Sequence, residues 1–230
     1  MNILEFEKSI GYSFKNKELL KRALTHSSFI NAQHDRALMN NERLEFLGDA
    51  FFDAIISEEL CKRMPKVEEG VLTKIRAKVI CEKSLAMHGN KLGIGQYIRL
   101  GKGEREHGGK ERPSIIADAL EAIVGAIFTD GGYDAAKTFV IATFDKTIDQ
   151  AIAGKLFNDY KTEIQEKITS KIGHLEYKIV KEEGPPHDKV FYAELYCNEK
   201  LIGQGIGKTK KEAENNAAKQ GLERGGELVL

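Results

Sequence analysis

The sequence predicts two consecutive domains of different fold class, an all-α domain over residues 1–150 and a small α+β domain over residues 159–227. Apolar residues recur at helical spacing through most of the first domain. The last third of the chain instead alternates apolar and polar residues over short stretches bounded by turn residues, as strands do. Residues 151–158 are weakly patterned, so we expect a linker there.

The composition limits the class of protein. The 230 residues are 41% hydrophobic and 30% charged, which is typical of globular proteins. No apolar run approaches the roughly 18–20 residues of a membrane span, and the chain start lacks the basic and apolar regions of a signal peptide. The three cysteines are far apart without a Cys-x-x-Cys pair, which predicts neither a zinc site nor disulfides. A cytoplasmic location is therefore expected.

The charge does not by itself predict a partner. The formal net charge is zero, and residues 159–230 hold 12 basic and 13 acidic side chains. Binding to a polyanion would have to rest on a local patch, because phosphate contacts need placed cations.

The first domain is expected to consist of helices joined by short polar segments. An amphipathic first segment ends at the Thr25–Ser28 block, where His26 is more typical of a structural hydrogen-bonder than of a ligand. Helices are then predicted over residues 41–63, 72–87, 114–128 and about 134–150. A turn at Glu68–Gly70, a polar loop at 100–113 and a break at Asp130–Gly132 separate them.

The second domain is expected to fold in the order α-β-β-β-α. Helices are predicted over 160–170 and 208–222, and strands over 175–181, 190–197 and 201–207. The Gly184–Asp188 segment reads as a turn between the first two strands. This order suits an antiparallel sheet with both helices on one side.

Carboxylates on the helix over residues 41–63 are the first functional signal. Glu42, Glu45 and Asp49 are three and four residues apart, which places them on one face. Like charges stacked in this way repel and call for a cation or a basic ligand. From this stretch alone, an ordinary solvated acidic face explains the pattern equally well.

The helix over residues 114–128 strengthens the functional interpretation. It is apolar nearly all round and therefore buried, yet it carries Asp118 and Glu121. Buried acids are costly unless they are paired or bind a metal. Gly48 and Gly125 lie on the acidic sides of their helices, so we expect the two helices to cross there and to bring Glu45, Asp49, Asp118 and Glu121 together. Oxygen ligands of this kind select Mg²⁺ or Mn²⁺.

Several apparent motifs are discounted, and one basic cluster is kept. The glycines of 203–209 lack the spacing of a phosphate loop, Gly101-x-Gly103 is not a dinucleotide fingerprint, and His34-Asp35 has no partner histidines. No organic cofactor is therefore expected. Lysines at the start of the last helix (Lys208, Lys210, Lys211) favour phosphate, together with free N–H groups of the helix. A solvated helix start is the alternative.

Four sequence blocks in the first domain resemble the ribonuclease III family: Glu42–Asp49, Ala23–Ser28, Glu69-Gly70 and Ser114–Glu121. The second domain resembles a double-stranded-RNA-binding domain, with a Gly-Pro-x-His turn at 184–187 and a Lys-Lys-x-Ala run at 210–213. The order of the two domains is similar to that of bacterial family members. The Glu42–Asp49 block looks like the signature of the family. Phe51-Phe52 is bulkier than the small aliphatic pair that usually follows this signature in the family, which bears on core packing.

The resemblance implies an all-α nuclease and dimerisation domain with a defined acidic site. Glu45, Asp118 and Glu121 would ligate Mg²⁺, for which Mn²⁺ can substitute, and Asp49 and Glu121 would be most tied to catalysis. Glu42 and Glu69 match acids that line the cleavage cleft or its dimer contacts. Phe46 matches an aromatic residue that inserts across the interface of a homodimer.

The resemblance also implies how the second domain binds double-stranded RNA. Thr162, Gln165 and Glu166 would face one minor groove, and His187 the next. Lys208, Lys210 and Lys211 would contact phosphates across the major groove between them. This is recognition by A-form shape and 2′-hydroxyls. Glu182-Glu183 beside the turn leave the domain mildly acidic, so we expect modest, salt-sensitive affinity.

The sequence therefore predicts a Mg²⁺-dependent endoribonuclease that cuts double-stranded RNA by metal-assisted hydrolysis. The resemblance implies 5′-phosphate and 3′-hydroxyl ends, short 3′ overhangs, and ribosomal RNA precursors and structured messenger RNA as substrates. One alternative is a non-catalytic RNA-binding protein that uses the helical domain only to dimerise, but such a protein would not need all four acids. Another is a phosphohydrolase for small nucleotides, which would not need the second domain.

Overall fold

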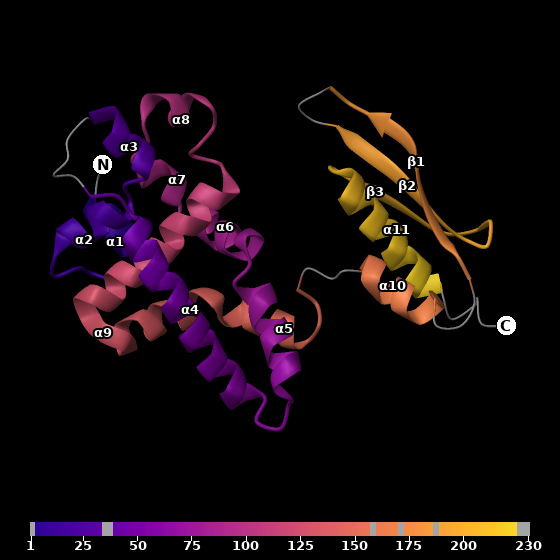
Figure 1. The fold of residues 1–230 in the computed structure, drawn as a ribbon, viewed down its shortest axis with the longest axis horizontal. Coiled ribbons are helices and arrows are strands. Elements are labelled where there is room, and N and C mark those ends of the chain that lie inside the picture. Colours follow the sequence, from indigo (N-terminus) through magenta and orange to yellow (C-terminus); the bar gives the residue numbers. More distant parts are fainter. Residues whose placement is uncertain (1–2, 34–38, 157–159, 170–172, 186–188, 225–230) are drawn as a thin grey trace. The chain divides into compact units, whose positions relative to one another are not determined.

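The computed structural model describes residues 3–33, 39–156, 160–169, 173–185 and 189–224. The chain divides into two compact units, residues 1–156 and residues 157–230, which we call the amino-terminal and carboxy-terminal units (Figure 1). The domain limits expected from the sequence, 1–150 and 159–227, stay a prediction. No helix within the described ranges is both long and apolar enough to cross a membrane.

Within its described residues, the amino-terminal unit consists of helices and the segments that connect them, as predicted. Its helices are α1 (Ile3–Ile10), α2 (Lys17–Ala23), α3 (Ser27–Gln33), α4 (Glu42–Arg63), α5 (Glu69–Val79), α6 (Glu82–Lys91), α7 (Ile94–Tyr97), α8 (Lys102–Glu106) and α9 (Pro113–Ile152). The apolar faces of α4 and α9 supply much of the core, including Phe52, Ile55 and Ile56 on α4 and Ile116 and Leu120 on α9, all almost fully buried.

The long helix α9 bends at the predicted break. Gly132 has φ of +80° inside α9, so two helical segments meet there across a kink. A positive φ is a conformation that glycine adopts without steric cost. Pro113 occupies the first turn of α9, where its missing N–H removes no helical hydrogen bond.

Three predicted boundaries in this unit are wrong. The helix predicted over 72–87 is two helices, because α5 ends at Val79 and α6 begins at Glu82 after an extended Cys81. The turn predicted at Glu68–Gly70 is shorter, since Glu69 already begins α5. The polar loop predicted over 100–113 contains the short helix α8.

Phe51 and Phe52 on α4 pack against aromatic side chains of α9. The Phe51 ring stacks on Phe128 with centroids 3.6 Å apart. The Phe52 ring meets Phe144 edge-on at 5.3 Å. These aromatic contacts add to the area that the two helices bury. The departure from small aliphatic residues is therefore accommodated by aromatic partners on α9.

The carboxy-terminal unit has the predicted α-β-β-β-α order (Figure 1). It consists of α10 (Tyr160–Thr169), β1 (Leu175–Glu183), β2 (Val190–Cys197), β3 (Lys200–Gly207) and α11 (Lys210–Arg224). The sheet is antiparallel in the order β1-β2-β3. Its core joins side chains from the sheet and both helices: Ile164, Ala193, Leu195, Ile202, Ala213, Ala217 and Ala218.

The glycines of β3 have a packing role. A β-carbon at Gly205 would lie 2.2 Å from the carbonyl oxygen of Ala213, and one at Gly203 would lie 2.2 Å from that of Ala217. Glycine and alanine thus let α11 lie directly on β3. This close packing explains the glycine run that imitates a phosphate loop.

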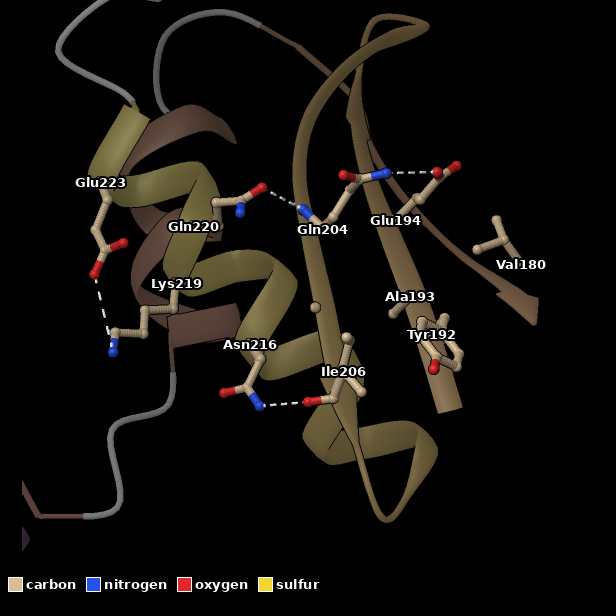
Figure 2. A pocket seen from close by; sticks show the side chains of 11 residues that line it. Val180, Tyr192, Ala193, Glu194, Gln204, Ile206, Asn216, Lys219, Gln220 and Glu223 are labelled. Atoms are coloured by element: carbon tan, nitrogen blue, oxygen red, sulfur yellow. Dashed lines mark hydrogen bonds and ion pairs between the residues drawn. The ribbon is translucent and has the colours of Figure 1, made fainter. Parts of the chain in front are cut away.

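Amide side chains of α11 reach the free edge of β3 (Figure 2). The backbone N–H of Gln204 donates to Oε1 of Gln220 over 2.9 Å. Nδ2 of Asn216 donates to the carbonyl oxygen of Ile206 over 2.8 Å. These bonds satisfy backbone groups that an edge strand otherwise offers to another chain.

Candidate metal centre

Helices α4 and α9 cross at the two glycines that the sequence singles out. A β-carbon at Gly48 would lie 1.8 Å from the carbonyl oxygen of Glu121. A β-carbon at Gly125 would lie 2.1 Å from the carbonyl oxygen of Leu44. Neither position can carry a side chain without separating the helices. The predicted close crossing is therefore confirmed.

This crossing brings three carboxylates together. Ligand oxygens of Glu45 on α4 and of Asp118 and Glu121 on α9 all lie within 4.8 Å of one another. All three side chains are half-buried. Glu45 lies one turn before Gly48 on α4, and Glu121 lies one turn before Gly125 on α9, so the crossing point directly sets the spacing of the acids.

The carboxyl groups of this cluster resist ionisation. Burial raises the pKa of Glu121 to about 8, and the charges of Asp49, Asp118 and Glu45 add to the shift. Burial also raises the pKa of Glu45, with contributions from Asp118, Glu42 and Asp49. The cause is the shared one of acids crowded together away from water.

The same shift indicates what the site can hold. A proton is one way to relieve the repulsion among the three carboxylates, and a divalent cation is the other. The available donors are carboxylate oxygens, which hard cations such as Mg²⁺ prefer. The residues present therefore fit a magnesium ion.

Of the four acids expected to come together, Asp49 is not among the three whose ligand oxygens converge. Asp49 and Glu42 are exposed on α4, and both act electrostatically on the cluster, as the pKa shifts of Glu121 and Glu45 indicate. Glu69 is not part of the cluster. Its Oε1 accepts a hydrogen bond from Thr73 over 2.7 Å, and it lines a cavity of about 180 Å³ with residues that include Arg76.

Two neighbours of Asp118, His26 and Glu82, influence the site without any spacing in the sequence that links them to it. Burial raises the pKa of Asp118, the charge of His26 opposes the shift, and that of Glu82 adds to it. Nδ1 of His26 accepts from the backbone N–H of Ser28 over 3.2 Å and lies 2.8 Å from its hydroxyl. His26 is thus a hydrogen-bonder, as expected, that also lies near the acids. Glu82 comes from α6, and no spacing in the sequence links it to Asp118.

Phe46 is unusually exposed for an aromatic residue. It lies on α4 next to Glu45, and 80% of its surface is accessible in the single chain. It makes no contribution to the core of its own unit. This placement is compatible with the predicted contact to a second copy.

Most of the predicted RNA contacts lie on α10 or at the start of α11. Thr162 and Gln165 are exposed on α10. Glu166 also belongs to α10, but its side chain is outside the described part of the structure, and His187 lies outside the described residues. The three lysines of the basic cluster are exposed: Lys210 and Lys211 begin α11, and Lys208 lies two residues before it.

The start of α11 is less open to anions than the sequence suggests. The hydroxyl of Thr209 accepts the backbone N–H of Glu212 over 3.1 Å. The carboxylate of Glu212 accepts the N–H of Lys208 over 2.7 Å. The expectation of free N–H groups is therefore wrong at these two positions, because the helix caps itself. Phosphate binding here would have to rest chiefly on the lysine side chains.

The chain is similar to known proteins over nearly its whole length. A family model described as "Ribonuclease-III-like" matches residues 16–148, and one described as "Double-stranded RNA binding motif" matches residues 160–224. A ribonuclease 3 of Clostridium perfringens is 46% identical over 99% of this chain and 96% of its own length. A ribonuclease 3 of Desulforamulus reducens is 47% identical over 93% of this chain and 87% of its own length.

Solved structures agree with these relatives. The nuclease domain of a ribonuclease III from Campylobacter jejuni superposes with a TM-score of 0.59 and 46% identity, over 63% of this chain and 97% of that chain. A second structure of that domain gives a TM-score of 0.58 over 64% of this chain and 95% of the other. With its acidic crossing of α4 and α9 and its RNA-binding motif, this chain belongs to the ribonuclease III family of double-stranded-RNA endoribonucleases.

Proposed function

We propose that this protein is a Mg²⁺-dependent endoribonuclease that cuts double-stranded RNA to 5′-phosphate and 3′-hydroxyl ends. The observation that carries the proposal is the group of three half-buried carboxylates, with oxygens within 4.8 Å of one another. The RNA-binding motif in the same chain supports the substrate class. A protein that only bound RNA would not need these acids, whose clustering raises their pKa values and disfavours their charged forms.

Each acid of the site has a proposed role. Glu45, Asp118 and Glu121 hold the metal, with Mn²⁺ able to replace Mg²⁺. A metal ion held there would supply Lewis-acid chemistry, which lowers the pKa of a bound water molecule and stabilises charge on phosphate oxygens. Asp49 supplies further negative charge beside Glu121 from the solvent side. Glu121 and Asp49 are the residues we assign most directly to catalysis.

The working form we propose is a homodimer. Phe46 offers an exposed apolar contact next to the metal ligands, and the Campylobacter jejuni nuclease domain is described as structurally flexible in a region involved in its dimer formation. Two copies supply two sites, one for each strand, which accounts for short 3′ overhangs. Glu42 and Glu69 are proposed to line the cleft or its dimer contacts.

RNA is proposed to bind along one side of the carboxy-terminal unit. Thr162, Gln165 and Glu166 on α10 face one minor groove, and His187 faces the next. The lysines at the start of α11 contact phosphates between them, in a mode that reads A-form shape. Ribosomal RNA precursors and structured messenger RNA in the cytoplasm are the proposed substrates.

Incubation of the full chain with an end-labelled RNA duplex, with and without Mg²⁺, tests the proposal. We expect cleavage only with Mg²⁺, and none by the isosteric variant Glu121→Gln, which still binds the duplex. Asp134→Asn on the same helix α9 serves as the control, since Asp134 is exposed and outside the cluster. Cleavage by Glu121→Gln at the normal rate would show that the site is misassigned.

A further inference from the structure

One carboxylate in the carboxy-terminal unit binds two lysines from different elements. Oε1 of Glu182 lies 2.9 Å from Nζ of Lys210. Its Oε2 lies 3.2 Å from Nζ of Lys189. Lys210 is the first residue of α11, and Lys189 immediately precedes β2. Glu182 therefore links Lys210, one of the proposed phosphate contacts, to the segment that leads into β2.

The fold holds this arrangement in place. Glu182 is near the end of β1 and lies opposite Phe191 of β2 in the ladder. The ammonium group of Lys210 lies 5.7 Å above the ring of Phe191. Strand register and helix start thus bring Glu182 and Lys210 together, although 28 positions separate them in the sequence.

These ion pairs contribute little to folding. The exposed fractions of the side chains are 36% for Glu182, 60% for Lys210 and 44% for Lys189, and ion pairs at such exposure are weak in water. The hydrogen bonds from Lys210 and then Lys189 lower the pKa of Glu182. The carboxylate is therefore ionised wherever the RNA-binding unit works near neutral pH.

The net charge of Glu182, Lys189 and Lys210 determines how many RNA phosphates this group can neutralise. Two ammonium groups facing one carboxylate leave a single net positive charge, which one phosphate neutralises. Without Glu182, the same two lysines could neutralise two phosphates. The pairing carboxylate also competes with phosphate for the same N–H donors, since both are anionic oxygen acceptors.

We propose that Glu182 sets the RNA affinity of this protein by competing with RNA phosphates for Lys189 and Lys210. The proposal deepens the proposed function and rests on it, because it needs the start of α11 to contact RNA. Its consequence is an affinity and a salt dependence lower than the lysines alone would give. Glu182 thus acts as a built-in restraint on substrate and product binding.

In the opposite role, Glu182 would hold Lys189 and Lys210 in positions that favour RNA binding. Exposed ion pairs restrain long side chains only weakly, whereas a carboxylate beside a phosphate repels it directly. Competition therefore outweighs ordering. The two roles predict opposite signs, because ordering would make Glu182→Gln bind RNA more weakly.

The adjacent residue supplies a matched control. Glu183 carries the same charge one position away and pairs instead with Lys181 and the hydroxyl of Tyr192. Neither partner is among the proposed RNA contacts. Glu183→Gln changes the net charge as much as Glu182→Gln does, but releases neither Lys189 nor Lys210.

The experiment measures duplex binding by the full chain in the Glu121→Gln background without divalent cations, so that cleavage does not interfere. The probe is a fluorescent RNA duplex longer than the roughly 16 base pairs that one such domain spans. We expect Glu182→Gln to bind about threefold to tenfold more tightly near 0.1 M salt, with a steeper salt dependence. Glu183→Gln should change affinity clearly less.

A variant that lacks both lysines separates the proposed RNA surface from the proposed competition by Glu182. In Lys189→Ala/Lys210→Ala, binding should be weaker, and the gain from Glu182→Gln should disappear, because its partners are gone. If the double lysine variant binds as tightly as the parent, the proposed RNA surface is wrong. If it binds more weakly but Glu182→Gln gives no gain in the parent, or an equal gain in both backgrounds, the competition by Glu182 is wrong.

Discussion

Gly48 on α4 lies so close to Glu121 on α9 that a β-carbon at position 48 would be 1.8 Å from the Glu121 carbonyl oxygen. The contact joins the backbone of one metal-ligand helix to a residue of the other. Because the obstructing atom belongs to the backbone, no side-chain rotation relieves it. The spacing of the acids therefore depends on the absence of a side chain at residue 48.

Gly48→Ala should accordingly separate the helices and disturb the cluster. We expect cleavage to fall at least tenfold and the protein to lose roughly 1–3 kcal/mol of stability, which is the typical cost of overpacking. Gly103→Ala is the control, since a β-carbon there meets nothing within 4 Å. Thermal unfolding and cleavage rate measure both effects, and a Gly48→Ala protein as active and stable as the parent would refute the crossing argument.

Removal of the metal should make the protein sensitive to alkaline pH through Glu121. Its pKa is about 8 in the folded chain, raised chiefly by burial, against 4.5 for a free glutamate. Between these values the unfolded state holds fewer protons than the folded state, so metal-free stability falls as pH rises from about 4.5 to 8. Glu121→Gln should remove this loss, on the order of 1–3 kcal/mol after allowance for partial exposure.

The comparison is made by thermal unfolding in chelator at pH 5 and pH 8. Glu121→Gln should stabilise the metal-free protein at pH 8 and have little effect at pH 5. Mg²⁺ should stabilise the parent at pH 8 more than the variant. Equal unfolding temperatures of parent and variant at pH 8 would mean that Glu121 is not strained without metal.

The sequence indicates the metal cluster because helical periodicity is regular. Spacings of three and four place Glu45 and Gly48 on the same side of α4, and Glu121 and Gly125 on the same side of α9. A glycine on the same side of a helix as an acid indicates that a second helix can approach closely there. The crossing of α4 and α9 and its metal ligands follow from this spacing and from the apolar character of the helix around Asp118 and Glu121.

Contacts that depend on the tertiary fold leave no such signal. Glu82 influences Asp118 from a third helix, and Glu182 reaches Lys210 from a strand. The break between α5 and α6 falls at Ile80-Cys81, which contains neither proline nor glycine. The sequence does not indicate the helix-capping role of Glu212, because the neighbouring lysines favour an open anion site instead.

His88 should make the folded protein sensitive to acid. It is buried on α6, its Nε2 lies 2.8 Å from the Thr147 hydroxyl, and its ring packs 4.0 Å from that of Phe144. Burial, and then the charge of Lys91, lower its pKa to about 4 from 6.5. Below pH 6.5 the unfolded state binds the proton first, so the neutral ring's stabilisation is lost as pH falls from about 6.5 towards 4.

His88→Gln should flatten the dependence of unfolding temperature on pH between about 4 and 6.5. The substitution lowers stability at pH 7, because it removes a packed ring, but its slope is the informative quantity. His107→Gln is the control, since His107 is exposed on the surface near α8. An unchanged slope in His88→Gln would show that His88 is not the titrating group.

Phe46 should control association with a second copy and little else. Its ring is 80% exposed, so Phe46→Asp removes no core contact and should leave the unfolding temperature of the monomer within a few degrees. We expect the variant to sediment as a monomer at concentrations where the parent is a dimer, because a buried charge disfavours an interface. Leu4→Asp, a change at another apolar side chain that is 63% exposed, should leave association unaltered. A dimeric Phe46→Asp would place the interface elsewhere.

Lys210→Ala combined with Lys211→Ala should weaken RNA binding in a salt-dependent way. Each lysine that neutralises a phosphate releases a counterion, so the slope of log affinity against log salt should shrink by about one for each such lysine removed. Because Glu182 already pairs with Lys210, we expect the slope of the double variant to shrink by less than the full amount for two lysines.

Titration of an uncut duplex from about 0.05 to 0.2 M salt gives the slope. The weakening should be the same for duplexes of unrelated sequence, since phosphate contacts carry no base information, and an unchanged slope would mean that these lysines do not touch the RNA backbone.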